Sequence, residues 1–226
     1  RNDQIHSKES FLEDYLNRIQ RDGFEEATIL CQSNMQCSSI NKYVRSRLGK
    51  PSGKLAVGDL LLVTQNNYNS DLMNGDLVIV KGLGSSEYRA DLTFREVEVE
   101  ELVSKRVYIL LLIESLLTLN QLNLDDRQHQ ILMIDYYNRM IASGVKYRSQ
   151  EFYDLMFHDP YLNALRVVYG YALTVHKAQG GEWPHVYLYL ENAVLGIPIP
   201  QNFNWMYTAV TRASQKLHLV EIWFIK

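Results

Sequence analysis

The stretch at residues 171–184 holds a dense group of side chains that could bind a phosphorylated ligand. Its polar members are Thr174, His176, Lys177, Gln179 and Glu182, and a glycine pair, Gly180 and Gly181, lies among them. The first four offer hydrogen-bond donors within a short space, and the glycines permit close backbone approach or a positive φ. Glu182 is an acceptor suited to a sugar hydroxyl. Such a set fits a nucleotide or a sugar-phosphate backbone.

A second candidate is Arg212, which lies near the C-terminal end of a helix predicted at residues 205–212. A guanidinium is always charged and fork-shaped, so it can neutralise an oxyanion on a phosphate that is being transferred. An isolated arginine is more often a salt-bridged surface residue, and that alternative stands beside the functional one.

Two further places carry candidate residues. Ser33 and Asn34 follow a short apolar strand predicted at 27–31 and precede a helix predicted at 35–48, so they are placed to cap that helix. Tyr68 lies among turn-forming asparagines, where an aromatic ring can serve as a stacking platform for a base.

The elements around these residues predict an α/β protein with a β-rich insertion. A strand–loop–helix unit at 27–48 is the building block of an α/β sheet, and the strand–loop alternation returns from residue 167. The predicted strands are 27–31, 60–64, 77–80, 94–102, 107–113, 186–190 and 217–224. The later predicted helices are 124–143, 150–165 with an interruption near Asp159 and Pro160, and 205–212. We therefore predict a first part of the α/β domain at 1–55, a small β-barrel with extra helices at 56–165, and a second part at 166–226.

The composition of the chain excludes several classes of protein. The 226 residues carry a net charge of −3, which excludes a basic nucleic-acid-coating protein but permits binding through a local patch. Two cysteines offer neither a disulfide framework nor zinc spacing, so no metal site is expected. The longest apolar run, 107–113, is too short to cross a bilayer and no signal peptide opens the chain, so we expect a cytoplasmic protein without a membrane partner. Because residue 1 is Arg, we expect a piece of a longer protein.

Two of these stretches resemble motifs of superfamily 1 helicases. Residues 174–182, Thr-Val-His-Lys-Ala-Gln-Gly-Gly-Glu, look like motif V, and residues 207–213, Tyr-Thr-Ala-Val-Thr-Arg-Ala, look like motif VI about thirty residues later. Residues 28–34 are similar to the weaker motif IV, and residues 58–76 resemble the SH3-like insert of the RecD-like branch. The stretch from about 114 to 162 matches no part of that family.

The resemblance implies the second RecA-like domain of a RecD-like DNA helicase, a P-loop NTPase-like fold with an SH3-like barrel inserted. Arg212 would be the arginine finger that reaches the γ-phosphate of ATP. The implied ATP-binding residues are Gln179, Gly180, Gly181 and Glu182, and the implied DNA-binding residues are Thr174, His176, Lys177, Ser33 and Asn34, with Tyr68 as the stacking candidate. The implied movement is 5′ to 3′ on single-stranded DNA. Repair or recombination proteins are further candidate partners.

ATP hydrolysis needs a P-loop and a Walker B acid, and the sequence contains neither. The nearest approach, Gly49 to Leu55, is one residue short of a P-loop. ATP and Mg²⁺ would therefore be held mainly by an upstream P-loop domain of the same chain, and the present chain alone should be inactive as an ATPase. Two alternatives remain open: a non-catalytic nucleic-acid-binding or partner-docking module, and a Pif-type helicase half, which would carry a hydrophobic residue at position 182 and Ser-Arg at 211–212.

Overall fold

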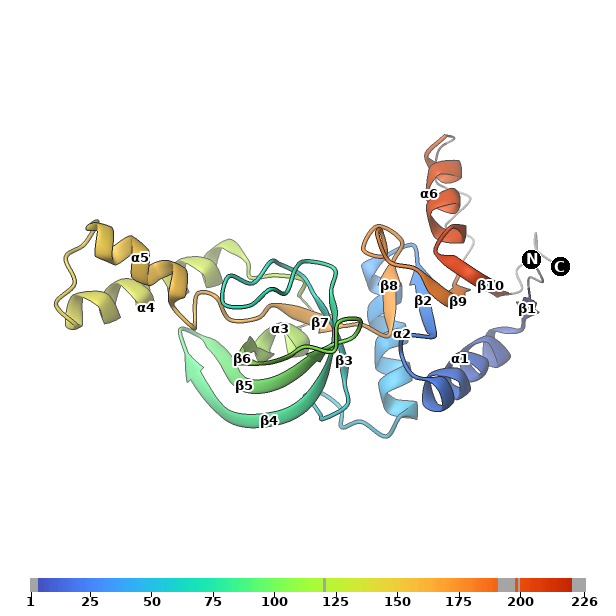
Figure 1. Cartoon of the computed structure of the whole chain (residues 1–226), viewed down its shortest axis with the longest axis horizontal. Helices are drawn as coiled ribbons and strands as arrows, with labels where there is room; N and C mark the ends of the chain where they lie inside the picture. The colour runs from blue at the N-terminus through green and yellow to red at the C-terminus, as the bar shows by residue number, and fades with distance from the viewer. Residues whose placement is uncertain (1–3, 120, 191–197, 199, 221–226) are drawn as a thin grey trace. The chain divides into compact units, whose positions relative to one another are not determined.

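The computed structural model describes residues 4–119, 121–190, 198 and 200–220, and the chain divides into two compact units (Figure 1). Unit 1 consists of residues 1–52 and 170–226, and unit 2 consists of residues 53–169. The sequence placed the corresponding boundaries at residues 55 and 165. None of the helices that the structure describes is long and apolar enough to cross a membrane.

Unit 1 contains a five-stranded parallel sheet with the strand order β1-β10-β9-β2-β8. Its strands are β1 (Gln4–His6), β2 (Ala27–Cys31), β8 (Ala172–Thr174), β9 (Trp183–Leu188) and β10 (Ala213–Val220). Its helices are α1 (Lys8–Asp22), α2 (Asn34–Arg47) and α6 (Gln201–Val210). The predicted α/β class with a parallel sheet is confirmed. Residues 221–224 of the predicted last strand lie outside the described residues.

The central strand β2 shows why this sequence forms a parallel sheet. All five of its residues are buried, as expected for a strand that is covered on both faces. Helix α1 packs against β2, and its side chains Phe11 and Tyr15 are fully buried. The Phe11 ring meets the Tyr187 ring of β9 edge to face at 5.4 Å between ring centroids. The core of unit 1 is therefore rich in aromatic rings.

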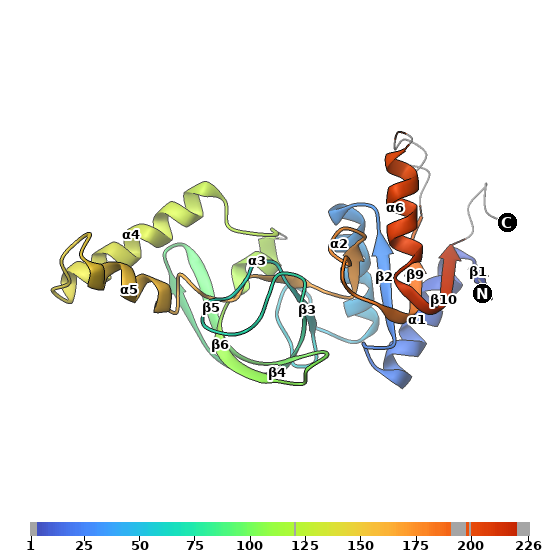
Figure 2. The same ribbon diagram turned by 45° about the horizontal axis from the view of Figure 1, so that its top comes forward.

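Unit 2 contains a five-stranded antiparallel sheet with the order β6-β5-β4-β3-β7 (Figures 1 and 2). Its strands are β3 (Leu60–Val63), β4 (Leu77–Arg89), β5 (Leu92–Glu101), β6 (Val107–Ile113) and β7 (Val167–Tyr169). Just before β7, Leu165 exchanges backbone hydrogen bonds with Leu111 (2.7 Å) and Ile113 (3.0 Å) of β6, so the two edges of the sheet meet at this point. The β-rich insert is thus present, and its assignment to the SH3-like class stays a prediction.

The helices of unit 2 are α3 (Glu114–Leu119), α4 (Asp126–Ala142) and α5 (Gln150–His158). The predicted interruption near Asp159 and Pro160 is confirmed, since α5 ends at His158, but the prediction that the helix continues to residue 165 is wrong. Pro160 disfavours helical geometry at Asp159, and the Asp159 carboxylate accepts the backbone N–H groups of Tyr161 (3.1 Å) and Leu162 (2.9 Å) in a turn. That turn returns the chain to β7.

Candidate functional site

The loop that carries the motif V residues follows strand β8 of unit 1. Strands β2 and β8 are neighbours, and Cys31 lies opposite Thr174 at their carboxyl ends. The loop folds on itself, since Thr174 O accepts the N–H groups of Lys177 (2.9 Å) and Ala178 (3.1 Å). The side chain of His176, which lies in this loop, is exposed to solvent. The loop is therefore a rigid turn that presents side chains to solvent.

Both glycines of this loop are structurally necessary. Gly180 has a φ of 88°, a conformation that a residue with a Cβ rarely adopts. A Cβ on Gly181 would lie 2.4 Å from the indole ring of Trp183. Gly180 thus has the positive φ that the sequence predicted, and Gly181 leaves room for the Trp183 ring, whereas the approach of a ligand to the glycines stays a prediction.

A polar pocket of about 430 Å³ lies between this loop and one face of α6, entirely within unit 1. It is lined by Gln32, Val175, His176, Gln179, Gln201, Asn204, Trp205 and Thr208. Four of these residues carry amides, which both donate and accept hydrogen bonds. The buried indole N–H of Trp205 has no hydrogen-bond partner among the described residues. The pocket therefore suits a ligand that is rich in polar groups.

Arg212 joins the end of α6 to the end of the motif V loop. Its guanidinium donates to Gly181 O (3.1 Å), Thr208 O (3.1 Å) and the Thr211 hydroxyl (3.2 Å). Its own carbonyl accepts the N–H of Trp183 at 2.9 Å. No carboxylate pairs with Arg212 in the part of the chain that the structure describes. These contacts therefore do not support the alternative that Arg212 is a salt-bridged surface residue.

The other predicted residues fall in several places. Glu182 is exposed. Lys177 is half-buried, and this burial lowers the pKa of its ammonium group. Ser33 is the N-cap of α2 and forms a capping box with Gln36, which confirms the capping interpretation. Asn34 is the exposed first residue of α2. Tyr68 belongs to unit 2.

Sequence reasoning missed the α6 side of the pocket. Residues 201, 204, 205 and 208 share one helical face because their spacing follows the helical repeat. The helix was predicted to begin at 205, so Gln201 and Asn204 fell outside it. Trp205 is only 7% exposed, so it also belongs to the buried core.

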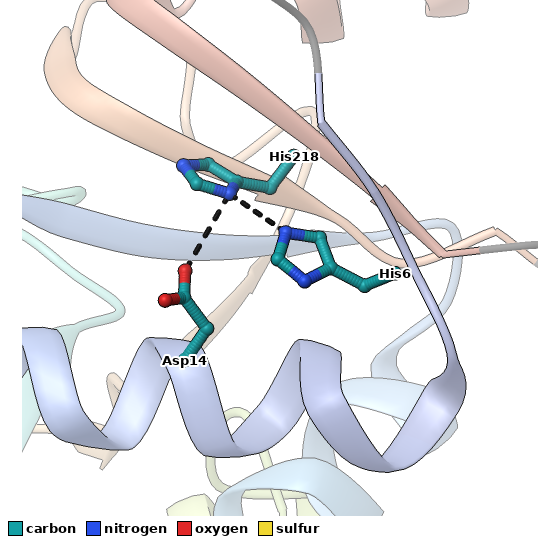
Figure 3. Close-up of side chains that lie close together, drawn as sticks. All are labelled: His6, Asp14 and His218. Carbon is teal, nitrogen blue, oxygen red and sulfur yellow. Dashed lines mark hydrogen bonds and ion pairs between the residues drawn. The ribbon is translucent and has the colours of Figure 1, made fainter.

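A cluster of histidines in unit 1 was also missed, because its members are far apart in the sequence. Nδ1 of His218 lies 3.0 Å from Nε2 of His6 and 3.6 Å from the Asp14 carboxylate (Figure 3). These three groups could geometrically hold a metal ion, with their ligand atoms within 4.8 Å of one another. The chain of contacts continues, since Nε2 of His218 lies 3.0 Å from Nδ1 of His185, and Nε2 of His185 lies 3.1 Å from Nη1 of Arg18.

Arg18, at one end of this chain of contacts, determines which ring nitrogens of the histidines carry protons. Arg18 can only donate, so Nε2 of His185 accepts and the proton of that ring is on Nδ1. His185 then donates to Nε2 of His218, which leaves the His218 proton on Nδ1, pointing at His6. Burial lowers the pKa of His218 to about 3 and also lowers the pKa of His185, so these rings are neutral. A protonated Nδ1 is not a metal ligand, and the expected lack of a metal site stays a prediction.

Unit 1 is therefore an α/β domain in which a glycine-bearing loop connects a polar pocket to Arg212, which has no acidic partner among the described residues. Residues 169–220 match the family of the UvrD-like helicase C-terminal domain. This segment contains both the motif V and the motif VI stretches, and the match supports a helicase C-terminal domain of the superfamily 1 type. The match does not confirm the assignment to the RecD-like branch of that superfamily.

Solved structures give a weaker likeness. The chain is similar to Pif1 helicase from Bacteroides in complex with ADP-AlF3 and single-stranded DNA, with 14% identity and a TM-score of 0.47 over 94% of this chain and 49% of that one. It is also similar to Pif1 helicase from Candida albicans, with 12% identity and a TM-score of 0.49 over 94% of this chain and 53% of that one. The chain thus spans about half the length of these proteins. The comparison with curated proteins finds no match.

Proposed function

We propose that the chain is the C-terminal motor half of an ATP-dependent DNA helicase or translocase of the RecD-like branch, moving 5′ to 3′ along single-stranded DNA. The observation that carries the proposal is the set of contacts of Arg212, whose guanidinium donates to neutral acceptors and to no carboxylate in the part of the chain that the structure describes. ATP and Mg²⁺ would be held mainly by an upstream P-loop domain of the same chain.

The guanidinium of Arg212 is suited to a phosphate in that arrangement. Of its five N–H groups, one on each nitrogen is already used, and one remains on each terminal nitrogen. Those two N–H groups can bind two oxygens of the γ-phosphate and stabilise the charge that develops during transfer. Glu182 and the glycines of the loop would lie near the ribose.

The pocket would grip the DNA strand. His176 is exposed at its edge, and the amides that surround it can bind phosphate oxygens or base edges. Thr174, Lys177, Ser33 and Asn34 would support this grip from the adjacent strand ends. Tyr68 would stack on a base at the insert.

The motif V loop physically links the pocket to Arg212. Gln179 lines the pocket, and Gly181, two residues later, binds Arg212 through its carbonyl oxygen. When Arg212 engages ATP, its bond to Gly181 would be strained or lost, and the loop would change its contact with DNA. Hydrolysis would then become directional stepping.

The test is ATP hydrolysis stimulated by single-stranded DNA in the full-length parent protein. Arg212→Ala should lower the rate by ~10³–10⁵, the range known for arginine fingers, while ATP binding and folding persist. The matched control is Arg106→Ala, because Arg106 is an exposed arginine that forms an ion pair with the exposed Asp71. Equal hydrolysis by Arg212→Ala and the unmodified protein would show that Arg212 is structural.

One observation favours the alternative of a non-catalytic nucleic-acid-binding module. The pocket is complete within unit 1 and needs no second domain. A parent protein that binds single-stranded DNA through His176 but hydrolyses no ATP would support this alternative over the motor.

A further inference from the structure

Three amide side chains on the pocket of unit 1 have no hydrogen-bond partner among the described residues. They belong to Gln179 of the motif V loop and to Gln201 and Asn204 of helix α6. All three are exposed, so they can exchange water for a ligand without breaking a hydrogen bond that the structure describes. A ligand that enters the pocket therefore meets three free amides.

A partnered amide of the same unit shows which kind of group such a side chain binds. The Asn41 amide accepts the backbone N–H of Ala172 (2.8 Å) and donates to the carbonyl oxygen of the same residue (3.4 Å). One amide thus pairs with a donor and an acceptor that lie side by side. The three free amides of the pocket are suited to a ligand with the same arrangement.

The charge of the lining argues against a phosphate as that ligand. Among the described residues, no lysine, arginine, aspartate or glutamate lines the pocket. Contacts with phosphate gain most of their strength from lysine and arginine. The amides therefore suit a neutral group, and the edge of a nucleic-acid base is a neutral group that carries donors and acceptors side by side.

The residue types in the lining also distinguish between the bases. Arginine and lysine pair with guanine, and carboxylates accept from the amino group of cytosine. An asparagine or glutamine amide instead forms two hydrogen bonds with adenine, since its oxygen accepts from N6 and its nitrogen donates to N7. The corresponding edge of thymine presents an acceptor and a methyl group without a donor. A lining of amides without charged side chains therefore matches adenine.

The size of the pocket and the positions of its residues fit a purine ring. The volume of about 430 Å³ lies within the range of roughly 300–1,000 Å³ of small-molecule sites. Gln201 and Asn204 lie one turn apart on the face of α6 that lines the pocket, and Gln179 lines it from the loop. Val175 and Trp205 add apolar surface on which a ring can lie.

We infer that this pocket binds an adenine ring through its edge, and that the ring is an unstacked base of the DNA strand. The choice of the strand over a free nucleotide rests on the proposed function, whereas the choice of adenine rests on the lining residues alone. The strand would then be held most tightly wherever an adenine enters the pocket.

The first experiment measures the affinity of the full chain for three labelled single strands of equal length: an oligodeoxyadenylate, an oligothymidylate and a strand without bases. The adenylate strand should bind about tenfold tighter than the thymidylate strand, which is the usual discrimination by one bidentate pair. Equal affinity for these two strands overturns the choice of adenine. Equal affinity for the adenylate strand and the strand without bases overturns a base in the pocket.

The second experiment repeats the comparison with the double variant Gln201→Met and Asn204→Leu, which removes two amides at similar size. Both positions are exposed, so the fold should persist, and the ratio of the two affinities should fall to near one. Comparing ratios between variants cancels the stacking within the adenylate strand itself. The matched control is Gln20→Met, which removes an exposed amide of α1 that does not line the pocket and should keep the ratio. An unchanged ratio in the double variant overturns the assignment to this pocket.

A third experiment uses adenosine monophosphate to separate the two sources of the ring. It should bind more weakly than the adenylate strand, because it lacks the backbone contacts of neighbouring nucleotides. Equal or tighter binding overturns the strand as the source. Binding of adenosine monophosphate but of no strand, with loss in the double variant, would mean that the proposed grip on DNA fails while the adenine pocket stands. Arg212→Ala should leave the preference for adenine unchanged, so a failed motor and a failed pocket are distinguishable.

Discussion

The two units bury polar groups in opposite ways. In unit 1, the contacts from Arg18 through His185 and His218 to His6 alternate donor and acceptor without a break. In unit 2, Arg166 is buried with a free guanidinium edge and no acidic partner among the described residues. A closed network stabilises and specifies the fold, whereas an incomplete one leaves part of the cost of burying a charge uncompensated. Arg166 therefore carries a cost of burial that the contacts around Arg18 offset.

The closed network in unit 1 also pairs its arginine with carboxylates. Arg18 lies 3.9 Å from the carboxylates of Asp14 and Asp22, and the Tyr187 hydroxyl donates to Asp14. The His218 ring stacks on Tyr187 at 4.1 Å between centroids. This cluster ties β1, β9 and β10 to helix α1, so we interpret it as structural.

The largest effect should come from breaking the closed network at its centre. His218→Ala removes a fully buried ring, leaves hydrogen-bonding atoms of His6 and His185 unsatisfied and opens a cavity, so it should cost about 3–5 kcal/mol. The measurement is urea unfolding followed by tryptophan fluorescence. All three tryptophans, at 183, 205 and 223, belong to unit 1, so this signal reports that unit.

The control for that experiment is His176→Ala, because His176 is exposed in the same unit and its loss should change stability by less than about 0.5 kcal/mol. Equal effects of the two variants would contradict a network that stabilises unit 1.

A smaller effect should follow from pH. The pKa of His218 is about 3 in the folded chain and near 6.5 in the unfolded chain, since burial and the neighbours His6, His185 and Arg18 outweigh the opposing effect of Asp14. Below pH 6.5 only the unfolded chain takes up this proton, so stability is full above that pH and falls toward pH 3. Linkage gives a loss of about 2 kcal/mol by pH 5. Urea unfolding at pH 7.5 and pH 5 measures it, and His218→Phe should flatten the difference; an equal pH dependence in that variant would assign the loss to other groups.

The sequence hints at the buried arginine of unit 2 but not at the histidine network of unit 1. Arg166 interrupts the apolar run Ala164 to Val168, which is a visible sign of a buried charge, although its lack of an acid appears only in the fold. The histidine network could not be predicted, because strand pairing alone brings residues 6, 185 and 218 together. By contrast, the strand 27–31 and the cap at Ser33 follow from local signals, and they were predicted correctly.

The smallest expected effect is the sharpest test of the proton assignment. Zinc should leave the stability of wild-type unit 1 unchanged, because the proton on Nδ1 of His218 blocks coordination. In Arg18→Met, Nε2 of His185 no longer has to accept a hydrogen bond, so the protons of His185 and His218 can shift and free Nδ1 of His218 for a metal. Zinc should then raise the melting temperature of this variant, seen by tryptophan fluorescence, and the double variant Arg18→Met with His6→Ala should lose that gain. Stabilisation of the wild type by zinc would mean that the cluster is a metal site and that its hydrogen-bond network is not closed.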